Sequence, residues 1–198
     1  MTTDQDKSVN REDVLKELAL YIGSKCWLDA HYGVLKLNKI LFYSDFHAFK
    51  KRGKPITGVE YKKYVHGPAP AVMKRMRKEL EESEEAYEYE NPLPTVDEDG
   101  EHFVEKRLLA RRPADLNKYL TAEEIAIVDG VIEWLRPLTG RQVSDMSHQH
   151  PGWRLAEMDT TIPYVAALLP EKPDTLSASD LKWAKAIANQ FEAGALAE

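Results

Sequence analysis

The segment from Val34 to Arg52 constrains the fold more than any other part of the chain. Its apolar residues cover more than one stripe of a helix, so a helix here must be buried on most of its sides. These residues are Leu35, Leu37, Ile40, Leu41, Phe42, Phe46 and Phe49. Three consecutive cations and then Gly53 follow, which suits the negative C-terminus of a helix and a glycine cap. We therefore predict a central buried helix around residues 34–52.

Capping residues and apolar residues at helical spacing predict further helices on both sides of this segment. We expect helices from Asn10 through Ile22, from about Ala71 to about Ser83, from Thr121 to Pro137, from Thr139 through His148, and from Ser177 to about Phe191. Pro70 suits the first position of the second of these helices, and Pro151 is expected to close the fourth. Residues 162–169 are expected to form a packed connection or a short helix.

Two regions predict β-structure. Residues 59–65 are rich in tyrosine and valine, which favours a short strand. The strand runs into His66-Gly67-Pro68-Ala69-Pro70, where the prolines restrict the backbone and predict a rigid connection. Residues 87–89 and 102–109 flank an acidic, proline-containing excursion and predict the arms of a hairpin. The predicted fold class is mainly α (α+β), a compact helical domain with a small β-hairpin.

Length and composition indicate one folded domain. A chain of 198 residues with 43% hydrophobic content can bury a sizeable core. We expect a disordered leader over residues 1–9 and a single domain over residues 10–194, because no repeat or internal boundary is visible. The longest apolar stretches are far shorter than a membrane span, and the N-terminus lacks a signal-peptide layout. The single cysteine, Cys26, fits a reducing compartment, so we predict a cytoplasmic protein without a membrane partner.

The charge balance disfavours nucleic acid as the main partner. With 33 acidic and 27 basic side chains, the net charge is −6, which opposes attraction to phosphates over most of the surface. Residues 121–150 imitate a helix-turn-helix, but acidic side chains outnumber arginines across 121–158. One basic cluster has two interpretations, a solvated helix end and loop or a docking surface for an acidic partner. The cluster consists of Lys50, Lys51, Arg52, Lys54, Lys62 and Lys63.

Motifs of common catalytic chemistry are missing from the sequence. It contains no phosphate-binding glycine loop, no H-E-x-x-H pair and no G-x-S-x-G elbow. His148 and His150 offer two imidazoles, but a metal site needs at least three ligands in fixed geometry. Asp45 in the buried helix needs partners, such as His66, a tyrosine or an arginine, and favours a structural network over a general acid or base. We therefore expect no enzyme, no cofactor and no metal site.

A composite motif resembles the family of SocA-like antitoxins, also called the Panacea domain and related to the phage protein GepA. It begins with the run from Lys36 to Asp45, continues with the Gly53–Gly58 loop and Glu60-Tyr61, and reaches the His66-Gly67-Pro68 turn. A later serine-histidine pair followed by a tryptophan resembles a second family patch. The residues that carry the resemblance are Lys36, Lys39, Tyr43, Asp45, Gly58, Tyr61, His66, Gly67, Pro68, Ser147, His148 and Trp153.

The resemblance implies an antitoxin of a type II toxin–antitoxin system that neutralises a cognate toxin by direct binding. It also implies a candidate partner, an alarmone-synthetase-like or other nucleotide- or RNA-targeting toxin. One alternative is a proteolytic adaptor that delivers a toxin to the protease ClpXP. A weaker alternative is a small hydrolase-like enzyme built around Asp45 and His66 or His148.

The motif residues themselves are open to two interpretations, structural or toxin-binding. We expect one polar network where the central helix meets the His66-Gly67-Pro68 turn, formed by Lys36, Tyr43, Asp45, Tyr61, His66 and His148. If that network is structural, toxin contacts are expected on less patterned exposed parts, which include residues 50–63 and the acidic hairpin.

Overall fold

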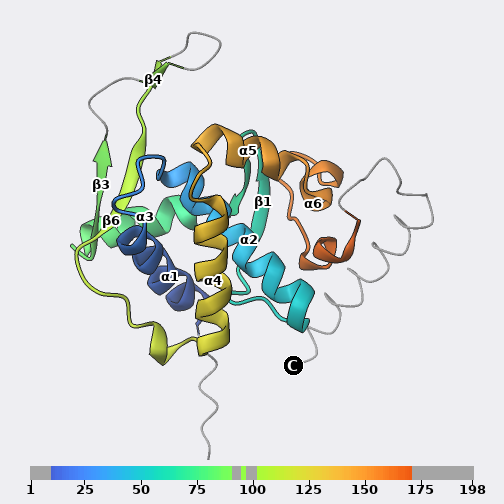
Figure 1. The fold of residues 1–198 in the computed structure, drawn as a ribbon, viewed down its shortest axis with the longest axis horizontal. Coiled ribbons are helices and arrows are strands. Elements are labelled where there is room, and N and C mark those ends of the chain that lie inside the picture. The colour runs from blue at the N-terminus through green and yellow to red at the C-terminus, as the bar shows by residue number, and fades with distance from the viewer. Residues whose placement is uncertain (1–9, 91–94, 97–101, 171–198) are drawn as a thin grey trace, which may run out of the picture.

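A computed structural model describes residues 10–90, 95–96 and 102–170 of the chain (Figure 1). Within them the helices are α1 Arg11–Lys25, α2 Val34–Arg52, α3 Met73–Glu82, α4 Ala122–Leu135, α5 Gly140–His148 and α6 Pro151–Leu155, with 3-10 turns η1 Leu116–Lys118 and η2 Tyr164–Leu168. The strands are β1 Tyr61–Tyr64, β2 Gly67–Pro70, β3 Ala86–Glu90, β4 Thr95–Val96, β5 His102–Phe103 and β6 Lys106–Ala110. The predicted fold class, mainly helical α+β with small antiparallel pairs, is confirmed.

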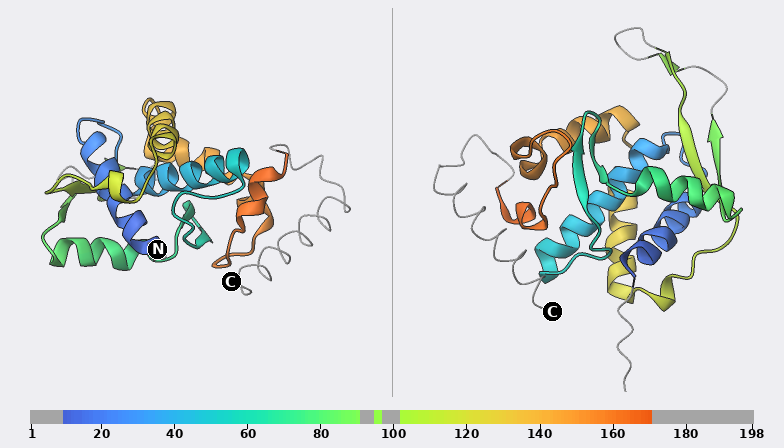
Figure 2. Two further views of the ribbon diagram at one scale, coloured as in Figure 1. Left: turned by 90° about the horizontal axis from the view of Figure 1, so that it is seen from below. Right: turned by 180° about the vertical axis from the view of Figure 1, so that it is seen from behind.

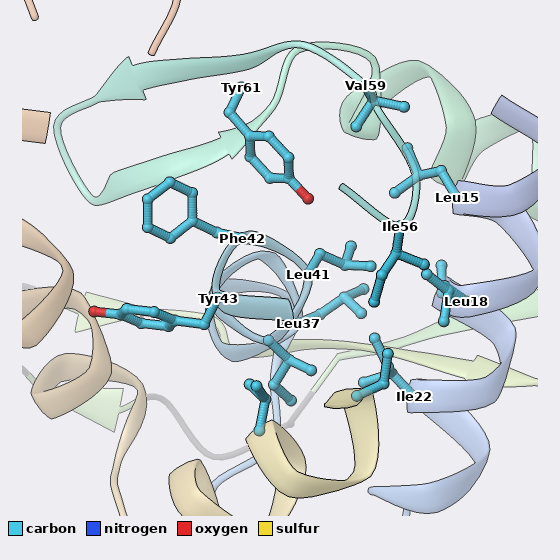
Figure 3. Close-up of a cluster of buried hydrophobic side chains, with 14 of the residues drawn as sticks. Leu15, Leu18, Ile22, Leu37, Leu41, Phe42, Tyr43, Ile56, Val59 and Tyr61 are labelled. Carbon is cyan, nitrogen blue, oxygen red and sulfur yellow. The ribbon is translucent and has the colours of Figure 1, made fainter. Parts of the chain in front are cut away.

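Helix α2 is the centre of the molecule, as its apolar pattern predicts. Figure 2 shows α4 on one side of α2 and the β1–β2 hairpin on the other. In Figure 3, Leu15, Leu18 and Ile22 of α1 face Leu37 and Leu41 of α2. Each of these five side chains is buried, and burying one contributes roughly 1.5–3 kcal/mol relative to leaving it in water. The helix is therefore held from several directions at once.

The caps predicted from the sequence set the ends of several helices. Asn10 accepts a hydrogen bond from the Glu12 amide at 3.1 Å and begins α1. Thr121 and Thr139 each form a capping box, which begins α4 and α5 respectively. Gly53 ends α2 with a φ of 73°, in the left-handed region that glycine tolerates.

The segment from Gly67 to Pro70 corrects the predicted rigid connection, because it forms strand β2. It pairs antiparallel with β1, with Tyr61 opposite Pro70 and Tyr64 opposite Gly67. The Ala71 amide donates to the Glu60 carbonyl at 2.9 Å and extends the pairing. This bond delays the next helix, so α3 begins at Met73 and Pro70 is not its first residue. Two prolines are tolerated here because a short strand at a sheet edge can lack donors.

The predicted hairpin is confirmed by β3 and β6, which pair antiparallel from Ala86 opposite Ala110 to Glu90 opposite Lys106. The short strands β4 and β5 also pair with each other. Arg77 of α3 attaches this hairpin to the domain, 2.9 Å from Glu88, and Lys106 of β6 pairs with Glu90 of β3 across the two strands at 2.7 Å. Part of the acidic excursion is thus neutralised by basic neighbours.

The C-terminal part of the described chain differs from the prediction at Pro151. Pro151 begins the short helix α6, in addition to following α5, because proline suits the first turn of a helix. Residues 164–168 form the 3-10 turn η2. The helix predicted from Ser177 and the leader over residues 1–9 lie outside the described residues. Within the described part, no helix is long and apolar enough to cross a membrane.

Candidate functional site

Helix α2 carries three charged side chains that are buried yet point to different parts of the fold. Lys36 and Lys39 are each 1% exposed, and Asp45 is 0% exposed. A buried charge is costly unless it is paired or hydrogen-bonded, so the partners of each one define what the motif does.

Asp45 is bound by the loop and strand that follow α2. Its carboxylate accepts hydrogen bonds from the Ile56 amide at 2.8 Å, the Thr57 amide at 2.7 Å and the Thr57 hydroxyl. The hydroxyls of Tyr61 and Tyr164 donate to the same carboxylate at 2.9 and 3.3 Å. Tyrosine was one of the partner types expected, whereas His66 and arginine are not among these donors. Sequence reasoning missed Thr57 and Tyr164.

The charge of Asp45 is held by neutral donors. Burial raises the pKa of the Asp45 carboxyl above its usual value, and the bonds from Thr57, Tyr61 and Ile56 oppose that rise. Burial also raises the pKa of the Tyr61 and Tyr164 hydroxyls, with the nearby carboxylate acting in the same direction. Both phenols therefore stay protonated and keep donating.

Lys39 binds the tip of the β1–β2 hairpin through main-chain atoms. Its Nζ donates to the His66 carbonyl at 2.6 Å and to the Pro68 carbonyl at 3.2 Å. The Ser144 hydroxyl of α5 donates to the same His66 carbonyl at 2.8 Å. Burial lowers the pKa of Lys39 to about 7. The His66 side chain is exposed, so this residue takes part through its backbone.

Gly67 is required where the hairpin tip meets α2 and α5. Its φ is +93°, a conformation that residues with a side chain rarely adopt. A Cβ at this position would lie 2.6 Å from the Lys39 Cε and would also collide with the Ser147 hydroxyl. Ser147 itself donates to the Ser144 carbonyl at 2.6 Å. The glycine of the His66-Gly67-Pro68 turn thus permits close contact between the hairpin and both helices.

Lys36 joins two connections on the α4 side of α2. Its Nζ lies 2.8 Å from the Asp29 carboxylate and donates to the carbonyls of Arg136 and Leu138, both at 2.9 Å. The loop between α1 and α2 is thereby tied to the turn between α4 and α5. Tyr43 lies on this side too, with its ring 5.0 Å from that of Trp134.

His148 and Trp153 form a stack beside β1. Their rings lie 4.1 Å apart and nearly parallel. The Trp153 indole donates to the Tyr64 carbonyl at 3.1 Å, and the Lys63 ammonium lies 4.2 Å from the same ring. Burial, followed by the charge of Lys39, lowers the pKa of His148. The pair therefore holds β1 through the Tyr64 carbonyl and the Lys63 side chain.

The expected single network is wrong in its geometry, because the residues divide into separate clusters. Asp45 and Tyr61 form one cluster, Lys39 with the His66 backbone forms another, and Lys36 forms a third. Figure 3 shows Tyr43 and Tyr61 on different sides of α2, with their hydroxyls pointing apart. Gly58 has a φ of +68° in the loop beside the Asp45 cluster.

In the part of the chain that the structure describes, the buried groups show no arrangement suited to a shared metal ion. Among the described residues, no group of three or more His, Cys, Asp or Glu side chains could hold one. His150 lies against Phe42 and Phe46, and its Nδ1 accepts from the Gly152 amide, which caps α6. Burial lowers its pKa to about 4. Burial raises the pKa of the Cys26 thiol to about 11, which suits a packed side chain better than a nucleophile.

The fold and these clusters define a class of small, mainly helical α+β domains whose polar motif residues bind other parts of the same chain. The family model described as "Antitoxin SocA-like, Panacea domain" matches residues 37–154. This match covers more than half of the chain, so the protein belongs to that family. Membership supports an antitoxin role and, with it, a toxin partner. Neither a curated protein nor a solved structure matches the chain.

Proposed function

We propose that this protein is the antitoxin of a type II toxin–antitoxin pair and neutralises its toxin by binding it directly in the cytoplasm. The observation that carries the proposal is the family match over residues 37–154, which spans α2 to α6. A nucleotide- or RNA-targeting toxin, such as an alarmone-synthetase-like enzyme, is the proposed partner on the strength of the family resemblance.

In this proposal the motif residues form the scaffold and do not contact the toxin. Lys36, Lys39 and Asp45 are almost fully buried, and their hydrogen bonds go to loops and to the hairpin. A buried side chain cannot touch a partner unless the domain opens. Toxin recognition then belongs to exposed side chains, which can change without disturbing the scaffold.

The test is co-expression with the product of the adjacent gene in a bacterial host. Expression of that product alone should stop growth, and co-expression with this chain should restore it. The purified proteins should form a stable complex in size-exclusion chromatography with light scattering. Failure of co-expression to restore growth would refute the antitoxin proposal.

The same assay separates blocking from delivery to a protease. In a host lacking ClpXP, direct neutralisation should restore growth as fully as in the parent host. Rescue that is lost together with ClpXP would instead identify the chain as an adaptor. Toxin abundance, measured by immunoblot, should stay unchanged in the first case and fall only in the parent host in the second.

A further inference from the structure

An open groove lies between the C-terminal half of α2 and the middle and C-terminal parts of α4. Its volume is about 420 Å³. It is lined by His47, Lys50, Lys51, Ala126, Ile127, Gly130, Val131 and Trp134. Figure 1 shows α4 crossing α2, with the two helices diverging toward the end of α2. Most of the lining is apolar, apart from the two lysines and the imidazole.

Aromatic rings form one wall of this α2–α4 groove. Trp134 is 45% exposed, and His47 stacks on it with ring centres 5.7 Å apart. The Tyr43 ring also meets the indole, edge-on, with ring centres 5.0 Å apart. A half-exposed tryptophan held by two neighbouring rings is a large, ordered apolar surface, and such tryptophans are enriched at the centres of protein interfaces.

Gly130 is the one position of α4 in the groove lining that has no side chain. Glycine in a helix interior is less stable than alanine. A Cβ at Gly130 would meet no atom within 4 Å, so packing inside the domain does not require glycine there. The open space in front of its backbone is part of the groove, and another backbone could approach closely there.

The rim of the groove on α2 carries positive charge. Lys51 and Arg52 are matched by Glu123 and Glu124 at 2.9 and 2.7 Å. Lys50 lines the groove and is exposed, and no carboxylate of the described residues forms an ion pair with it. A partner segment that buries apolar side chains here therefore gains attraction if it places a carboxylate beside Lys50.

We propose that the α2–α4 groove binds an amphipathic helix of the toxin, with apolar side chains against Trp134 and Gly130 and an acidic side chain beside Lys50. The inference rests on the proposed antitoxin function and assigns its contact surface. A groove between two diverging helices suits a third helix, whose anchors recur every three or four residues. The basic cluster noted in the sequence is therefore split between two places. Lys50 lines the groove, whereas Lys63 packs on Trp153, which is not part of the groove lining.

The test measures binding of full-length variants to the purified product of the adjacent gene by isothermal titration calorimetry. Gly130→Leu fills the groove, Trp134→Ala removes its wall, and Lys50→Glu reverses its rim charge. Each is expected to weaken binding at least tenfold and to reduce growth rescue. The loss from Lys50→Glu should shrink as salt rises, because the rim is exposed.

Matched controls place the same chemical changes elsewhere. Glu133→Leu adds a leucine to an exposed position of α4 outside the groove lining, and Lys74→Glu reverses a charge on α3. Both should bind as the wild type does. Thermal unfolding should show that Gly130→Leu is at least as stable as the wild type, which excludes misfolding as the cause of weak binding.

The outcomes separate this inference from the proposed function. The docking site is refuted if the wild type binds the toxin and restores growth while all three groove variants bind it just as tightly. That result would leave the antitoxin role intact. Absence of both binding and rescue by the wild type would overturn the two together. A dimer in sedimentation that Gly130→Leu dissociates would identify a second copy of this chain as the occupant and would also refute the inference.

Discussion

The most unusual residue of the domain is Lys39, a buried lysine whose two hydrogen bonds both go to backbone carbonyls. Burial favours the neutral amine, which lowers its pKa to about 7. Asp45 shows the converse, since burial raises its pKa while five donors hold its oxygens. At this scale the fold tolerates these two ionisable groups by surrounding each with main-chain or hydroxyl partners.

Lys39 should make stability depend on pH. Between its folded pKa of about 7 and the ordinary value of 10.5, the unfolded chain holds a proton that the folded chain lacks. The free energy of unfolding should therefore rise with pH in this window, by at most about 1.4 kcal/mol per pH unit from this group. Urea unfolding of wild type and Lys39→Met from pH 7 to 9 measures the difference. Parallel curves would contradict the prediction.

Asp45→Asn should destabilise the domain without a separate effect on toxin neutralisation. An amide keeps one acceptor oxygen but turns a donor toward the Thr57 or tyrosine hydroxyls, so at least one buried donor loses its partner. We expect the free energy of unfolding to fall by about 1–3 kcal/mol, measured by urea unfolding. A variant that stays folded and binds the toxin but fails to restore growth would point instead to an enzymatic role for Asp45.

At the scale of elements, the β1–β2 hairpin is fixed to α2 from both ends. Tyr61 binds Asp45 near the start of β1, and Lys39 binds the carbonyls at the tip. The attachment requires glycine at position 67 in the tip, whereas packing inside the domain does not require glycine at position 130 in α4. Substitution by alanine should therefore lower the free energy of unfolding at Gly67 and raise it at Gly130.

Gly67→Ala should cost much more stability than Gly53→Ala. Both glycines have positive φ, +93° and +73°, so both alanines are strained. Only at Gly67 does the added Cβ meet Lys39 and Ser147, while the space around Gly53 is open. We expect losses of about 1 kcal/mol at Gly53 and about 2–4 kcal/mol at Gly67, from strain plus overpacking. Equal losses in chemical denaturation would show that the contact with Lys39 is unimportant.

Gly130→Ala should have the opposite sign and stabilise the protein. The position lies inside α4 and has open space for a methyl group. Helix propensity predicts a gain of about 0.5–1 kcal/mol in the free energy of unfolding. The midpoint of thermal unfolding should rise accordingly, and a decrease would show that the open space at this position is needed by the isolated domain.

At the scale of the whole molecule, local sequence patterns predicted the central helix, the capped helices α1, α4 and α5, and the β3–β6 pairing. They did not predict β2, because its prolines resemble a turn until a partner strand supplies the hydrogen bonds. Thr57 and Tyr164 reach Asp45 only through tertiary packing, and Tyr164 lies 119 positions after Asp45 in the sequence. No local pattern marks contacts of that kind.

The separation of the polar clusters could have been predicted from the spacing of their residues along α2. Nine positions separate Lys36 from Asp45, and at about 100° per residue they lie on opposite sides of one helix. Tyr43, seven positions after Lys36, returns to the Lys36 side and faces Trp134. Helical geometry therefore argues against one shared network, whereas the identity of each partner depends on how the loops close around α2.

Anchoring of the hairpin tip through carbonyl oxygens has a practical consequence for protein engineering. Val65 is 68% exposed and the His66 side chain also faces solvent, while the contact with Lys39 uses only the His66 main chain. His66→Cys should therefore change the free energy of unfolding by less than about 0.5 kcal/mol, as expected for a surface substitution. Urea unfolding checks this value, and a larger loss would reveal a role for the imidazole. A fluorescent dye attached there would report on complex formation from a rigid position outside the α2–α4 groove.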